Sequence, residues 1–358
     1  MLKKNILAGL CVFALHGVWA GEIDITGTQT QWIHASPSSQ PTIRSSRSMA
    51  LTQPIALMSV KVSSQGIKNL FARESISSES VGTQVDAGLP RSKQLGMNHV
   101  PVLDQGAHGS CVLFAVTGIL DAALYRPDEI SQLCQLELGT YLSKVGKTPS
   151  GWDGSIGHIV LNQIEQFGYM TKTQQRSLGC GGLTEYPRDS EEIPDVQMKL
   201  DEFSALAQDK RFISFPLLHI NEAFSMPIDT QRILIKVKKA IQSGDRVMFS
   251  SLLVDPDQGV AGAVGQYHQP NDTWILTTAL RQNMGSDDHL AAHAMIITGY
   301  DDDVILEDSE GLKHKGLLTL RNSWGPDAGD RGNYYMSYDY FTSLVMEAHQ
   351  VRSQFISQ

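Results

Sequence analysis

The sequence lacks several features that would assign it to simple classes of protein. Its 358 residues contain no block of Lys or Arg, and the formal net charge is −9 at pH 7. An acidic chain without a basic cluster argues against nucleic acid as a partner. Beyond the start of the chain, no stretch approaches the roughly 18 apolar residues that a membrane span needs, so we expect no membrane anchor. No internal repeat is visible. With 41% hydrophobic and 19% charged residues, the chain has the composition of a globular protein.

Residues 1–20 have the pattern of a secretory signal peptide. Lys3 and Lys4 form a basic start, an apolar stretch follows over 6–15, and Val18 and Ala20 are small enough for a signal peptidase. The apolar stretch is too short to cross a membrane. The sequence therefore predicts an exported protein, either secreted or periplasmic.

Cysteine is scarce, and one of the four cysteines lies in the predicted signal peptide. Cys111, Cys134 and Cys180 remain after its removal. In an oxidising compartment an odd number favours one disulfide and one free thiol. Three unpaired, buried cysteines are the alternative.

Residues 21–87 differ in pattern from the rest of the chain. Residues 28–34 alternate like a strand, residues 55–62 form a β-compatible apolar run, and residues 65–74 have one apolar helical face. The polar residues 75–88 have the composition of a linker. We expect a hairpin followed by a helix in this segment.

Residues 88–358 have the pattern of a packed domain. Helices are expected first and strands mostly later, which favours an α+β fold over alternating βαβ units. The expected helices are 111–124, 156–166 and 230–243, and the expected strands are 246–254, 274–280, 294–300, 317–322 and 333–337.

The stretch PVLDQGAHGSCVLFA combines a cysteine with the start of an apolar helix. At the first turn of a helix, Cys111 feels the positive end of the helix dipole, which favours the thiolate. A nucleophilic thiolate needs an imidazole as its acid and base, and the imidazole needs a third group to orient it. The carboxamide of Gln105, upstream, could stabilise an oxyanion. His293, just before an apolar strand, and Asn322, at the end of another, are the candidates for the other two groups.

Together, the stretches PVLDQGAHGSCVLFA, HAMIITGYDDD and NSWGPDAGDRGNYYMSYDYF resemble the papain-like cysteine peptidase family. The resemblance implies that Cys111 is the nucleophile, that His293 is the general base and acid, and that Asn322 orients its imidazole. It also implies that Gln105 and the backbone N–H of Cys111 form an oxyanion hole. We expect an ion pair of the Cys111 thiolate and the His293 imidazolium as the resting state of the active enzyme. Trp324 would shield the Asn322–His293 hydrogen bond and line the substrate site.

The resemblance implies an α+β fold of two lobes with the active-site cleft between them. A helical left lobe would carry Cys111, and an antiparallel, β-barrel-like right lobe would carry the His and the Asn. The stretch WDGSIGHIVLNQIEQFG resembles the family's substrate-backbone segment, so Gly154 and Ser155 are expected to bind substrate. The resemblance also implies a disulfide between Cys134 and Cys180.

The chain departs from the family at several positions. His108 replaces a cysteine of the family, Val112 replaces an aromatic residue, and Ala292 precedes the histidine where Asp or Asn is common. The interval between the cysteine and the histidine is also longer than usual, and we expect the excess in loops within 185–227 and 255–288.

These observations predict a secreted, bacterial-type cysteine endopeptidase with an unusual N-terminal pro-segment. Residues 21–87 would be an intramolecular inhibitor, the substrates would be proteins or peptides, and we expect a monomer. One alternative is an enzyme that cleaves isopeptide bonds or transfers acyl groups with the same three residues. Another is a degenerate homologue that binds proteins without cutting them, which Val112 and Ala292 favour.

The sequence predicts no metal site and no cofactor. His289 and His293 are four residues apart, as in zinc peptidases, but Leu290 stands where that motif needs Glu.

Overall fold

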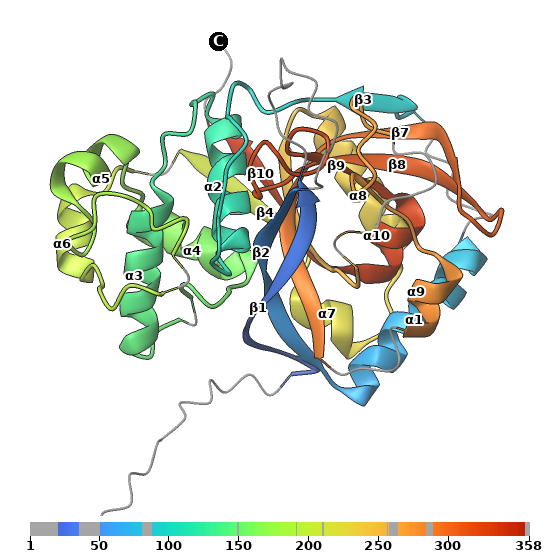
Figure 1. The fold of residues 1–358 in the computed structure, drawn as a ribbon, viewed down its shortest axis with the longest axis horizontal. Coiled ribbons are helices and arrows are strands. Elements are labelled where there is room, and N and C mark those ends of the chain that lie inside the picture. Colours follow the sequence, from blue (N-terminus) through green and yellow to red (C-terminus); the bar gives the residue numbers. More distant parts are fainter. Residues whose placement is uncertain are drawn as a thin grey trace, which may run out of the picture.

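The computed structural model describes residues 21–35, 51–80, 88–148, 150–190, 192–209, 211–255, 257, 264–283 and 289–354. The predicted signal peptide lies outside these residues. The helices of residues 111–206 gather on one side, and a large, mainly antiparallel sheet with further helices around it lies on the other (Figure 1). The predicted α+β fold class is confirmed.

The helical side is built around α2 (Cys111–Ala123), all of whose residues are buried. Such a helix is apolar on every face because other elements pack around it. A disulfide between Cys134 in α3 and Cys180 closes this side of the molecule, as the resemblance implies. The other helices here are α3 (Gln132–Lys144), α4 (Gly157–Phe167), α5 (Lys172–Leu178) and α6 (Leu200–Leu206).

The sheet runs in the order β4-β10-β5-β7-β8-β9-β6 and has β7 near its centre. Because β7 is long, different parts of it pair with β2, β3, β5 and β8. Except for the parallel pair β6–β9, these neighbours are antiparallel. The strands are β3 (Ser92–Gln94), β4 (Phe212–Leu218), β5 (Arg246–Leu252), β6 (Thr273–Trp274), β7 (His289–Glu307), β8 (Lys313–Arg321), β9 (Asn333–Ser337) and β10 (Val345–Ser353).

The structure confirms most of the expected elements and corrects one. The strand predicted over 333–337 is β9. The strand predicted over 274–280 is wrong, because only Trp274 of that range is in β6 and a helix begins at Thr278. A short apolar run alone does not separate a strand from a buried helix segment.

Four more helices lie on the side of the sheet. They are α7 (Ile220–Ser225), α8 (Thr230–Gln242), α9 (Thr278–Asn283) and α10 (Tyr338–Leu344).

The N-terminal segment forms β1 (Ile23–Ala35), β2 (Leu51–Val62) and α1 (Ser64–Ser80). The two strands pair antiparallel, and β2 joins the main sheet by pairing with the first residues of β7. Figure 1 shows this pair of strands between α2 and β7. The secondary structure agrees with the expected hairpin and helix, whereas the division of the chain into pro-segment and peptidase domain stays a prediction.

Among the described residues, no helix is both long and apolar enough to cross a bilayer.

Candidate active site

Cys111 is the first residue of α2 and the free cysteine of the described chain. Its thiol is fully buried. Burial raises the pKa of this thiol, and the backbone groups of Ala294, Val112 and Cys111 itself act to lower it. The Ala294 contact places the sulfur beside the residue that follows His293 in β7.

His293 and Asn322 meet as the resemblance implies. The His293 Nε2 lies 2.7 Å from the Asn322 Oδ1. That Oδ1 also accepts the backbone N–H of Ser323, which identifies it as an oxygen and assigns the ring proton to Nε2. The Trp324 ring stacks on the imidazole with centroids 4.5 Å apart and shields the bond from water.

This arrangement leaves the His293 Nδ1 as the basic nitrogen of the neutral ring. Nδ1 has no hydrogen-bond partner among the described residues, and its surroundings are buried. The thiol of Cys111 therefore lies beside the strand that carries the imidazole without a hydrogen bond to it.

Gln105 is held by the strand end that carries Asn322. Its side-chain oxygen accepts the Ser323 hydroxyl at 2.7 Å, and its backbone N–H donates to the Ser323 carbonyl. Its Nε2 donates to the carbonyls of His108, at 2.9 Å, and of Ala56, at 3.0 Å. The amide that we expect to stabilise an oxyanion is therefore occupied by a carbonyl of β2.

The hairpin also contacts the two glycines nearest the site. A Cβ at Gly109 would lie 2.0 Å from the Thr28 Cγ2, so only a glycine lets β1 approach the start of α2 this closely. At Gly154, where φ is +115°, a Cβ would meet the side chains of Ile25 and Met58. The residue expected to contact a substrate backbone is thus covered by the hairpin.

Two further predicted substrate residues are placed differently. Ser155 follows Gly154, is buried, and has its hydroxyl 3.5 Å from the Ser150 hydroxyl. The backbone carbonyl of Trp324 accepts the Gln53 Nε2 at 2.8 Å, which is another contact with β2. Gln53 lies beyond Ala56 along this strand, so β2 contacts the predicted site over several residues.

The covered site has an uncharged thiol and an uncharged imidazole. Burial raises the pKa of Cys111 to about 12, against the lowering effect of its backbone hydrogen bonds. Burial also lowers the pKa of His293 to about 4, although the Asn322 bond acts in the opposite direction. Both shifts oppose a thiolate–imidazolium pair while the hairpin covers the site, because burial removes the water that would stabilise both charges. The pair stays a prediction for the uncovered enzyme.

Tyr186 is part of the site, but the sequence did not predict it as a site residue. Its hydroxyl donates to the Gln105 carbonyl at 2.8 Å and lies 2.9 Å from the Ser110 hydroxyl. It therefore connects the residue before the thiol with the residue that carries the carboxamide. Its ring stacks on Trp152 and meets Phe114 edge-on. Tyr186 comes from a loop that we expected to hold the extra length of the chain, and a single tyrosine in a loop shows no pattern.

Comparisons with known proteins agree with a cysteine peptidase. A sequence profile described as the Peptidase C1-like family matches residues 224–358, which is less than half of the chain. The match includes His293, Asn322 and Trp324 and does not reach Cys111 or Gln105. It supports the prediction of a cysteine peptidase.

One curated sequence and several solved structures are similar to this chain. Aminopeptidase C of Lactobacillus helveticus is 28% identical over 133 residues, which are 36% of this chain and 26% of that protein. Xylellain, a cysteine protease from Xylella fastidiosa, matches with a TM-score of 0.46 and 14% identity, over 75% of this chain and 88% of that one. Digestive procathepsin L 3 of Tenebrio molitor larval midgut matches with a TM-score of 0.44 and 18% identity, over 75% and 72%.

Proposed function

We propose that this protein is an exported cysteine endopeptidase that is made as a zymogen. The observation that carries the proposal is the His293–Asn322 bond of 2.7 Å under Trp324, with the Cys111 thiol against the backbone of Ala294. A thiol at a helix start, a ring with a free basic nitrogen and a group that fixes its tautomer are the parts that nucleophilic acyl transfer needs.

In the uncovered enzyme the proton of the Cys111 thiol moves to the His293 Nδ1. The thiolate attacks a peptide carbonyl, and the oxyanion is stabilised by the Gln105 amide and the backbone N–H of Cys111. The imidazolium then gives its proton to the leaving amine, and a thioester remains. Water loses a proton to His293 and attacks the thioester, which releases the acid and restores the thiol.

The hairpin supports the zymogen part of the proposal. The Ala56 carbonyl accepts from the Gln105 Nε2 at 3.0 Å, so it takes the donor that a substrate oxyanion would use. β2 pairs with β7 from Met58 to Lys61, next to His293, and thus fills an edge that a substrate could use. The hairpin blocks the site and also holds the thiol and the imidazole in their neutral forms.

The test is to cut the chain after it has folded. A recognition site for a specific protease is placed within residues 81–87, and the full chain is folded before it is cut and the N-terminal part is separated. We expect hydrolysis of a fluorogenic peptide library and labelling by an epoxide probe only after cutting. Cys111→Ala in the cut chain should lower the rate at least about 10⁴-fold, as for other nucleophile deletions.

The results separate the two parts of the proposal. Equal activity before and after cutting would reject the zymogen and keep the peptidase. No labelling and no hydrolysis by the cut chain would reject the peptidase and favour a protein that binds without cutting.

A further inference from the structure

Three histidines and a glutamate from distant parts of the chain, none of them predicted as site residues, meet in one place, and the charge of Glu347 also acts on Cys111. One ligand atom each of His158, Glu347 and His349 can be chosen so that all three lie within 4.8 Å of one another. His158 is in the first turn of α4, whereas the other two are on β10. His219, the residue before α7, adds a third ring.

The three imidazoles form a nearly equilateral triangle. The ring centroids of His158 and His219 are 6.0 Å apart, those of His219 and His349 are 6.1 Å apart, and those of His158 and His349 are 6.3 Å apart. The His219 ring is therefore about as far from His158 and His349 as these two rings are from each other.

The carboxylate of Glu347 is buried beside His158 and His349 and is held in a fixed orientation. Its oxygens accept the backbone N–H of Gly157 at 2.9 and 3.0 Å, the Ser250 hydroxyl at 2.9 Å and the His349 Nε2 at 2.9 Å. A carboxylate that three donors hold in place is a ligand of fixed position, and Zn²⁺ accepts carboxylate oxygens.

The cluster is tightly packed against the backbone of Gly157, where a larger residue would not fit. A Cβ at Gly157 would lie 3.0 Å from the His349 Cδ2 and 3.1 Å from the Glu347 Oε2. Any side chain here would push into the carboxylate and the ring. His158 and His219 are only half-buried, whereas Glu347 and His349 are 1% and 2% exposed, so the cluster opens to solvent on the side of the first two.

We propose that this cluster is a Zn²⁺ site with His158, His349 and Glu347 as ligands and His219 as the fourth. Imidazole nitrogens with one carboxylate oxygen are a donor set that Zn²⁺ binds in tetrahedral geometry. The ion would take the place of the His349–Glu347 hydrogen bond. It would also join α4 and the start of α7 to β10, and thus stabilise the contact between the helical side and the sheet. The site is distinct from Cys111 and His293, and the proposal does not depend on peptidase activity.

The prediction of no metal site from the sequence rested on a local motif at His289 and His293. The cluster proposed here has no such motif, since only Glu347 and His349 are close in sequence. They are two residues apart on one strand and so share a face.

The test uses the full chain without an affinity tag and with Cys111→Ala, so that the thiol cannot bind metal. Zn²⁺ binding is measured by titration calorimetry and by competition with a chelating dye, and Co²⁺ absorption reports tetrahedral coordination. We expect one ion per chain and a higher unfolding temperature with Zn²⁺. His158→Ala and His219→Ala change half-buried residues, and each should weaken binding at least about tenfold, since even outer-shell changes cost that much.

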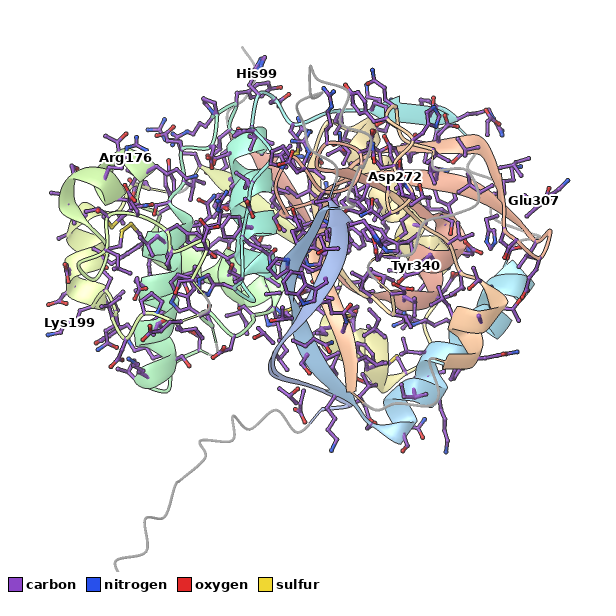
Figure 2. The ribbon with its side chains drawn as sticks, in the orientation of Figure 1. His99, Arg176, Lys199, Asp272, Glu307 and Tyr340 are labelled. Carbon is purple, nitrogen blue, oxygen red and sulfur yellow. A yellow bond between two sulfur atoms is a disulfide. The ribbon has the colours of Figure 1, made fainter. Side chains whose placement is uncertain are left out.

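The matched control is His99→Asn. His99 is exposed at the edge of the molecule (Figure 2) and has a φ of +70°, which Asn tolerates. This variant should bind Zn²⁺ like the parent. If the alanine variants unfold, His349→Gln replaces them, because Gln keeps a hydrogen-bond donor to Glu347. Binding that is absent, or equal in the control and in the folded cluster variants, would overturn the proposal.

Discussion

The two parts of the N-terminal segment attach to the rest of the molecule in different ways. The hairpin of β1 and β2 contacts predicted site residues through backbone pairing and apolar side chains such as Met58. Helix α1 instead packs against α7 and α10 and is held by Arg73. The guanidinium of Arg73 is buried and donates to the carbonyls of Ser343, Val345 and Ala223 at 3.0, 2.8 and 2.7 Å.

The difference indicates two separate roles. We call the hairpin (23–35 and 51–62) the lid, because it covers the thiol and the imidazole and excludes water from them. We call α1 the anchor, because its polar contacts fall on helix ends away from the site. Burial lowers the pKa of Arg73 to about 9. Among the described residues, this cation is stabilised by the partial charges of the three carbonyls and by the ring of Phe224, whose centroid lies 6.0 Å from the guanidinium carbon. The following predictions separate the lid from the anchor.

The largest effect is expected from a charge placed under the lid. Met58 is 1% exposed and packs over Gly154, so Met58→Asp buries a carboxylate without a partner. This carboxylate should destabilise the closed lid by about 3 kcal/mol, and the peptidase activity of the uncut chain should therefore rise about 100-fold. Trp32→Asp is the matched control, because Trp32 is on the same hairpin and 63% exposed. Equal activation by both variants would show that general instability, and not the opening of the lid, is responsible.

The next effect depends on pH and concerns the lid alone. The closed lid holds the pKa of His293 near 4, whereas an open lid lets it return toward the ordinary 6.5. Below pH 6.5 the open form therefore binds a proton that the closed form does not, and closure weakens until the pH reaches about 4. At pH 5 the free energy of lid closure should be less favourable by on the order of 2 kcal/mol than at neutral pH.

Hydrogen exchange of the full Cys111→Ala chain measures this effect without the coupled titration of the thiol. After correction for intrinsic rates, the amides of β2 should exchange faster at pH 5 than at pH 7, and those of α1 should change less. Adding His293→Gln should remove the pH dependence of β2. If the dependence persists in that variant, another group controls the lid.

A smaller effect is expected from the anchor. Arg73→Met keeps the apolar bulk of the side chain but removes three hydrogen bonds, which should loosen α1 by about 1–2 kcal/mol. The uncut chain should then become about tenfold more active, and its unfolding temperature should fall. Lys68→Met is the control, because it removes the same charge from an exposed position of α1. No activation by Arg73→Met would mean that the lid holds without the anchor.

The smallest effect concerns the machinery that the lid covers. Tyr186→Phe removes the hydroxyl between Ser110 and Gln105, and the ring keeps its stacking on Trp152. In the cut chain we expect kcat to fall about three- to tenfold with little change in KM, because one positioning hydrogen bond is lost. A change in KM alone would assign Tyr186 to substrate binding.

Local sequence was enough to predict the elements whose pattern is local. The apolar run that begins at Cys111 predicted α2, and the stretch 333–337 predicted β9. The stretch 274–280 failed because its apolar residues fit a strand or a helix end equally well, and packing decided for the latter. β10 and α10 were not predicted, since their residues pack against strands that come much earlier in the chain.

The sequence by itself determined the residue types of the site and their order. A cysteine at a helix start and an asparagine directly after a strand are readable because each depends on a few neighbouring residues. The histidine was expected just before a strand, but pairing with β2 and β5 extends β7 back to His289, so His293 lies within it. Only the tertiary structure decided that the Ala56 carbonyl occupies the Gln105 amide, that Tyr186 joins Gln105 to Ser110 and that His158 meets His349. These contacts join segments far apart in the chain, and the burial they create sets the pKa values of the thiol and the imidazole, which no local pattern encodes.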